Sequence, residues 1–279
     1  MVPYRLGGGT GKKMKTVGAR RKKIRRPEDT HTYRRDAVSG SRESGRITNR
    51  LLASLPQATL KRIRPSLEHL ITQRGDVIAR ADQPVEYIYF LNRGLVSFIK
   101  TMQDGRSVEV GVAGVEGLTS PHSIFGINRA ILDAVVQIPG SALRIRHGTL
   151  RRCLAEDNKL HEVLANYANF AIIAFAQTAA CNRLHHLEER CCRWLLVAHD
   201  SALSDTFPLT HEFLAMMLGV QRAGVSIAAH ALQRAGLIAY RHGQVTIINR
   251  SGLEDAACEC YAAMQIEFDK HFRTPKKSP

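Results

Sequence analysis

The segment "MMLGVQRAGVSIAAHAL", residues 216–232, decides how the C-terminal third of this chain folds. Apolar residues crowd both of its ends, but small and polar residues interrupt its middle. Gly219 suits the end of a short helix, because glycine readily adopts the left-handed conformation that a tight exit needs. A second helix can begin near Gln221 and continue to Arg234, with an inward side made by Val225, Ala228, Ala229 and Leu232. We therefore predict two short helices joined by a sharp turn.

The residues before Gly219 fit the first of these helices. Thr210 is a good N-cap, and Glu212 places an acidic group at the positive end of the helix dipole. Ala215 supplies the small side chain that two steeply crossing helices need where they meet. The spacing predicts a helix-turn-helix, and its second helix presents an outer edge made by Gln221, Arg222, Ser226 and His230.

The next segment, "GLIAYRHGQVTIINR", predicts two strands that turn at His242 and Gly243 and form a small wing. Arg241 and His242 at its tip are placed to reach a phosphate backbone. The DNA major groove admits one helix, and arginine can bond both acceptors of guanine at once. Arg222 is therefore the candidate base reader, beside Gln221 and Ser226 as contacts to base or phosphate. The alternative is that Arg222 contacts only the DNA backbone.

Residues 77–146 have the pattern of β-structure. Short β-rich runs alternate with turn signals at Asn92-Arg93-Gly94 and Asp104-Gly105, and two further strands are expected around Pro139-Gly140. Evenly spaced short strands of this kind predict a jelly-roll-like or barrel-like unit.

A long helix is predicted after residue 157, because the apolar period returns to that of a helix. One stripe of it could pair with a second copy of the chain, since small residues permit close approach and twofold pairing is the commonest oligomer. The alternative is a core helix that lies on its own β-unit. The proposed dimerisation stripe consists of Leu160, Leu164, Tyr167, Ala171, Ala174 and Thr178.

Positive charge is concentrated at the N-terminus. Residues 1–50 hold 15 Lys and Arg against 4 Asp and Glu, whereas the other 229 residues hold 25 against 21. The first 48 residues contain few apolar side chains, so we predict a disordered basic tail. A protein that binds nucleic acid non-specifically through this tail is an alternative function.

We expect a cytoplasmic protein that does not enter a membrane. No apolar stretch is expected to reach the ~20 residues that cross a bilayer, and the N-terminus lacks the apolar core of a signal peptide. The six cysteines fit reduced thiols in a cytosol.

No enzyme, cofactor or metal site is predicted. Cys191 and Cys192, near His185 and His186, and the later pair Cys258 and Cys260 lack the C-x₂-C spacing of structural zinc. A cupin-like metal enzyme is the remaining catalytic alternative, but cupins usually begin their ligand set with His-x-His, which His122 and His147 do not form.

With these residues in view, the chain resembles the Crp/Fnr family of bacterial transcription regulators over roughly residues 49–250. "LTHEFLAMMLGVQRAGVS" and "RGLVSFIKTMQDGRSVEVGVAGVEG" carry the resemblance, and Arg222 falls on the family's recognition-helix arginine. The resemblance implies an α+β chain that binds double-stranded DNA as a homodimer and contacts RNA polymerase. The expected parts are the tail at 1–48, a β-roll at 49–150, a dimerisation helix region at 151–182, a winged helix-turn-helix at 183–252, and a C-terminal helix and tail at 253–279.

The chain departs from the family's cyclic-nucleotide cassette. Glu116-Gly117 reverses the family's Gly-Glu order, and Leu132 and Asp133 stand where Arg and Ser or Thr would hold phosphate. We therefore expect no response to cyclic AMP. No cysteine precedes Cys153, so the N-terminal iron–sulfur cluster of some members is not expected. Ala223 replaces a Glu that follows the arginine in other members, which predicts a different operator.

Overall fold

The computed structural model describes residues 47–272 of the chain, and the predicted basic tail lies almost wholly outside them. The N-terminal elements are α1 Arg50–Ala53, α2 Gln57–Ile63, η1 Arg64–Ser66, β1 Glu68–Thr72, β2 Val77–Ala79, β3 Tyr87–Thr101, β4 Ser107–Ala113, η2 Pro121–Phe125 and β5 Asp133–Arg146. The later elements are α3 His147–Glu156, α4 Asn158–Leu184, α5 Leu187–Ala202, β6 Thr206–Pro208, α6 His211–Leu218, α7 Arg222–Arg234, β7 Ile238–Arg241, β8 Gln244–Ile247, α8 Arg250–Ala256 and α9 Cys260–Phe272.

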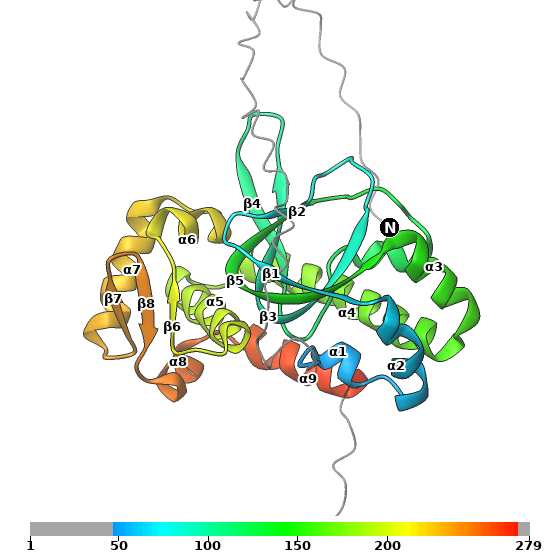
Figure 1. The fold of residues 1–279 in the computed structure, drawn as a ribbon. Coiled ribbons are helices and arrows are strands. Elements are labelled where there is room, and N and C mark those ends of the chain that lie inside the picture. The colour runs from blue at the N-terminus through cyan, green and yellow to red at the C-terminus, as the bar shows by residue number, and fades with distance from the viewer. Residues whose placement is uncertain (1–46, 273–279) are drawn as a thin grey trace, which may run out of the picture. The chain divides into compact units, whose positions relative to one another are not determined.

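The first sheet is the β-roll, with strand order β1-β5-β3-β4 and with β2 also paired to β5 (Figure 1). The predicted turn at Asp104-Gly105 is present, because Gly105 has a φ of 87° at the β3–β4 hairpin. The two other predicted breaks are wrong, since β3 runs through residues 92–94 and β5 through Pro139-Gly140.

Two glycines explain why these strands bend instead of turning. A Cβ on Gly94 would lie 2.6 Å from the carbonyl oxygen of Ile138, and one on Gly140 would lie 2.1 Å from that of Arg93. The β3–β5 register also shifts between Leu91 and Leu95. The glycines therefore permit a close backbone approach inside a bulged sheet, which is a strand signal that resembles a turn signal.

The long helix α4 packs one face against its own β-roll. Leu160, Leu164 and Tyr167 share a core cluster with Phe90 and Leu118 of the sheet region. Of the six residues assigned to the dimerisation stripe, Ala174 is half-buried within the single chain. The other five are buried: Leu160, Leu164, Tyr167, Ala171 and Thr178. These side chains already pack in the chain's own core and leave little surface for a second copy, so the predicted seam along this stripe stays a prediction that their burial does not favour. The alternative of a core helix describes this face.

A different face of α4 is exposed. We call it the outer stripe, and its residues recur three and four apart, as a helix pair requires. Ile172 is 60% exposed within it. The outer stripe consists of Asn169, Ile172, Ala176, Ala179 and Arg183.

Helix α4 is also apolar enough to pass a length-and-composition test for a membrane span, with a mean hydropathy of 1.3. This corrects the expectation that no stretch of the chain approaches that length. Such a test is also passed by the core helix of a globular protein, and the face of α4 that packs in the β-roll core accounts for part of its apolar residues, with 33% of the tested window buried.

The C-terminal elements form a second core that includes strand residues of the β-roll. The small sheet has strand order β6-β8-β7 and packs with α5, α6 and α7. Leu95 and Ile99 of β3 and Ile138 of β5 join Trp194 of α5 in the same cluster. At this junction Glu109 of β4 is buried and accepts from the indole Nε1 of Trp194 at 3.2 Å.

Candidate nucleic-acid interface

The predicted break at Gly219 is present. The residue has φ 64° and ψ 36°, and its N–H group bonds the carbonyl oxygens of Ala215 and Met216 at the end of α6. At the other end of α6 the Thr210 hydroxyl accepts from the backbone N–H of Phe213 at 3.3 Å, as the N-cap prediction requires. The left-handed glycine therefore ends one helix and lets α7 begin three residues later.

The exposed face of α7 begins with its first residue. Gln221 is the N-cap, and the Arg222 side chain is 66% exposed. His230 is exposed two turns later, whereas Ser226 is half-buried and lies 2.9 Å from His211 Nδ1 through its hydroxyl. The fold thus places the predicted α7 residues along one face, with Ser226 tied to α6.

Sequence reasoning missed one residue of this face. Ile227 is 68% exposed although it stands among the apolar residues of α7. A helical projection from His230 would have found it, because residues three positions apart share one side of a helix. An exposed apolar side chain there has the chemistry to contact a thymine methyl group.

Arg222 forms an ion pair with Glu212 of α6, at 2.9 Å between Nε and Oε1. Both side chains are largely exposed, and an exposed pair of this kind contributes little free energy. The pair therefore orients the guanidinium near the start of α7 without holding it strongly. An anionic partner can displace Glu212 at small cost.

The wing tip lies next to the start of α6. His242 and Gly243 have φ values of 50° and 75°, which is the geometry of a tight hairpin between β7 and β8. The N–H of Leu209 donates to the carbonyl of Gly243 at 2.8 Å, so the tip is tied to the residue before Thr210. Arg241 and His242 are both exposed there, as predicted.

His211 joins the two helices and the wing. Its ring centroid lies 4.5 Å from that of Tyr240 on β7, and its Nδ1 is bonded to Ser226. Burial lowers the pKa of His211, and the nearby Arg222 and His230 lower it further. The imidazole is therefore mainly neutral at pH 7 and serves as a structural contact, a role that sequence reasoning did not assign.

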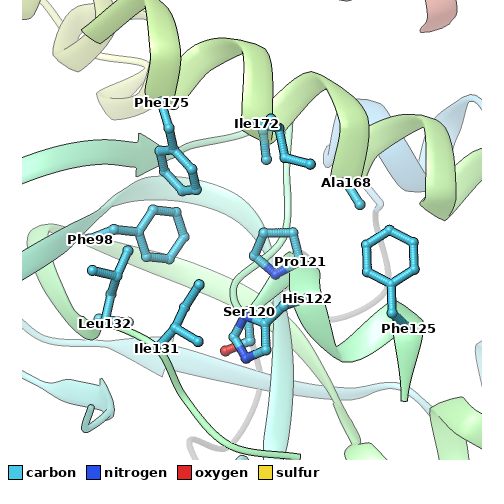
Figure 2. Close-up of a pocket in the computed structure, with 12 residues that line it drawn as sticks. Phe98, Ser120, Pro121, His122, Phe125, Ile131, Leu132, Ala168, Ile172 and Phe175 are labelled. Carbon is cyan, nitrogen blue, oxygen red and sulfur yellow. The ribbon is translucent and has the colours of Figure 1, made fainter. Parts of the chain in front are cut away.

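The β-roll contains a pocket of about 240 Å³ between η2, the sheet and α4 (Figure 2). Phe98 and Phe175 meet edge to face at its wall, with 5.8 Å between ring centroids. Ser120 and His122 are its polar lining residues, and none of the described lining residues is Lys or Arg. Burial lowers the pKa of His122, so this ring supplies no permanent charge.

The residues that depart from the cyclic-nucleotide cassette have other partners. Leu132 lines the pocket with an apolar side chain. Asp133 accepts from the backbone N–H of Ala81 at 2.8 Å, and Glu116 accepts from that of Gly114 at 2.9 Å. These two carboxylates therefore fix local backbone, and neither lines the pocket.

Comparisons with known proteins agree with this arrangement. Residues 71–157 match the family model of the cyclic nucleotide-binding domain, and residues 189–256 match that of the Crp-like helix-turn-helix domain. A search of curated proteins finds no match.

Solved structures share the fold at low sequence identity. FixK2 from Bradyrhizobium japonicum is 19% identical, with 69% of this chain and 98% of that chain covered and a TM-score of 0.57. A CRP-family transcriptional regulator from Thermus thermophilus is 20% identical, with coverages of 68% and 96% and a TM-score of 0.56. A putative cAMP-binding regulatory protein from Silicibacter pomeroyi is 17% identical, with coverages of 77% and 98% and a TM-score of 0.54. The β-roll, long helix and helix-turn-helix follow one another in the family's order, and this chain belongs to the Crp/Fnr family of transcription regulators.

Proposed function

We propose that this regulator binds a specific operator as a homodimer and does not respond to cyclic AMP. The observation that carries the proposal is the exposed start of α7, where Arg222 follows the turn at Gly219. Gln221, Ser226, Ile227 and His230 add base or phosphate contacts on the same helix. Thr210, Arg241 and His242 contact the flanking phosphates, because the wing tip lies beside the start of α6.

The outer stripe of α4 supports the dimer. Ile172, Ala176 and Ala179 are exposed at helix-pairing intervals, and the two alanines allow a second helix to come close. Two copies joined along this stripe would present two recognition helices, so the operator is expected to be partly palindromic. RNA polymerase is a further partner that the family resemblance implies.

The apolar pocket supports independence from cyclic AMP. A cyclic nucleotide brings a phosphate, and a buried anion without a cationic or hydrogen-bonding partner is costly. The pocket lining given above offers Ser120 and His122 but no described Lys or Arg. An effector that fits this cavity is a small, mostly apolar molecule.

Selection of bound sites from random duplex DNA tests the function. The full chain and a chain of residues 49–279 are each expected to enrich the same partly palindromic motif, with weaker binding by the shorter chain. Enrichment of no motif, or loss of all binding without the basic tail, would contradict the proposal and favour non-specific binding through the tail.

A further inference from the structure

Four metal-binding side chains from two distant segments meet beside the joint between α4 and α5. Cys181 and His185 lie at the end of α4, Cys258 lies between α8 and α9, and Cys260 begins α9. Their donor atoms all lie within 4.8 Å of one another, and the three cysteines are buried. The fold thus assembles a Cys₃His set that neither segment contains alone.

Two separations within the set match one tetrahedral ion. Zinc–sulfur bonds of about 2.3 Å place two thiolates of a tetrahedron about 3.8 Å apart, and a sulfur and a nitrogen slightly closer. Here Cys181 Sγ and Cys258 Sγ are 3.6 Å apart, and Cys260 Sγ and His185 Nδ1 are also 3.6 Å apart. An iron–sulfur cubane would hold its thiolates farther apart, because its own iron atoms lie between them.

The surrounding groups are those that support a bound metal. The second ring nitrogen of His185 lies 3.0 Å from the carboxylate of Glu259, which is the carboxylate–histidine arrangement that orients metal-ligating imidazoles. Gln177, one turn before Cys181 on α4, donates to the Cys260 sulfur at 3.0 Å. The contact with Glu259 uses His185 Nε2 and leaves Nδ1, the nitrogen near the Cys260 sulfur, available to a metal ion.

The local backbone structure and the nearby charge also suit a bound metal ion. The backbone N–H of His185 bonds the carbonyl of Cys181 at 3.2 Å, so the two ligands keep the helical spacing that places them on one face. Three thiolates and one divalent cation carry a net negative charge, and the buried guanidinium of Arg190 donates at 2.9 Å to Oδ1 of Asn182, the residue after Cys181. Arg190 also donates to the carbonyl of Leu218, the last residue of α6.

We propose that Cys181, His185, Cys258 and Cys260 bind one zinc ion, which fastens the end of α4 to the α8–α9 connection. Sulfur-rich tetrahedral donor sets favour zinc among the common cellular divalent ions, and four protein ligands leave no open position for catalysis. The role is therefore structural. Through Arg190 the zinc centre is linked to the carbonyl that immediately precedes the Gly219 turn.

Elemental analysis of the full-length chain, purified without chelators or metal-affinity resin, tests the zinc site. We expect about one zinc per chain in the unaltered protein and less than about a tenth of that in Cys258→Ser. Cys191→Ser is the matched control, because Cys191 is buried nearby but outside the donor set, and it should keep its zinc. Glu259→Gln should weaken zinc affinity roughly 10-fold to 100-fold.

A measurement on the unaltered chain covers the case in which a ligand variant fails to fold. Zinc is removed with a chelator and replaced by Co²⁺, which should give thiolate-to-cobalt charge transfer and the intense visible bands of a tetrahedral site. Absence of both zinc and these bands would overturn the proposal. Iron with acid-labile sulfide, or a disulfide between Cys181 and Cys258 in the protein as isolated, would overturn it as well.

Discussion

The pocket of the β-roll and the exposed face of α7 differ in the chemistry that they offer a ligand. The pocket is lined by aromatic and aliphatic side chains, with Ser120 and His122 as its polar groups. The α7 face begins with an exposed guanidinium and continues with Ile227 and His230. The α7 face therefore presents a cation to a ligand, whereas the described residues that line the pocket present none.

The first test concerns the proposed dimer contact along the outer stripe of α4. Ala176→Glu places a charge where two copies are proposed to meet, so we expect monomers and a loss of operator affinity of about 10²-fold to 10⁴-fold. Sedimentation and operator titration measure both effects. Ile266→Glu, on the exposed side of α9, should remain dimeric. A dimeric Ala176→Glu protein would show that the outer stripe is not the seam.

The second test concerns Glu109, which lies where the β-roll packs against the C-terminal core. Burial raises the pKa of Glu109 to about 7 from 4.5, although Ser97, Arg193 and Trp194 oppose the shift. The folded state therefore binds the proton more tightly, and the wild type loses stability as pH rises from about 4.5 to 7. Glu109→Gln removes this loss. At pH 8 the free energy of unfolding of the variant should therefore be about 3 kcal/mol larger than that of the wild type.

Chemical denaturation at pH 5 and pH 8 measures this difference, which should shrink towards the lower pH. Glu162→Gln, on the exposed surface of α4, is the control and should show no comparable dependence. An equal effect of Glu109→Gln at both pH values would show that the buried carboxyl does not titrate as described.

The third test sharpens the description of the DNA-facing region. Thr210→Ala removes the side-chain bond to the Phe213 N–H from a helix of eight residues. The loss of an N-cap of this type costs about 1 kcal/mol of stability. Thr210→Ser should restore most of it, because serine caps equally well. Thermal unfolding of the three proteins gives the answer, and an unchanged Thr210→Ala protein would mean that the cap contributes nothing.

The smallest expected effect is that of cyclic AMP on the wild type. The apolar pocket offers no described cation to its phosphate, so calorimetry should record no binding heat and the unfolding temperature should not move. Binding with a micromolar Kd would contradict the proposed difference between the two regions.

Local signals predicted the helix-turn-helix well. Gly219, the Thr210 cap and the wing turn each depend on neighbouring residues, and the structure contains all three. The β-roll was harder, because Gly94 and Gly140 permit a close approach of two strands and read in sequence as turns.

Long-range packing was beyond the sequence. A stripe on α4 predicts that one face is apolar, but it does not say whether that face meets the chain's own sheet or a second chain. The zinc-binding set was missed for a related reason, since Cys181 and Cys258 become neighbours only when α9 packs beside α4. Short spacing rules such as C-x₂-C find sites within one segment, not between two.

The most direct test of operator reading by α7 compares Arg222→Ala with the wild type on the selected operator and on a scrambled duplex at one salt concentration. We expect the variant to lose about 1–3 kcal/mol of discrimination between the two duplexes while its affinity for the scrambled duplex changes little. Arg241→Ala, in the wing, should instead weaken binding to both duplexes equally. If Arg222→Ala discriminates between the two duplexes as well as wild type does, then α7 does not read the operator through this arginine and the central claim is wrong.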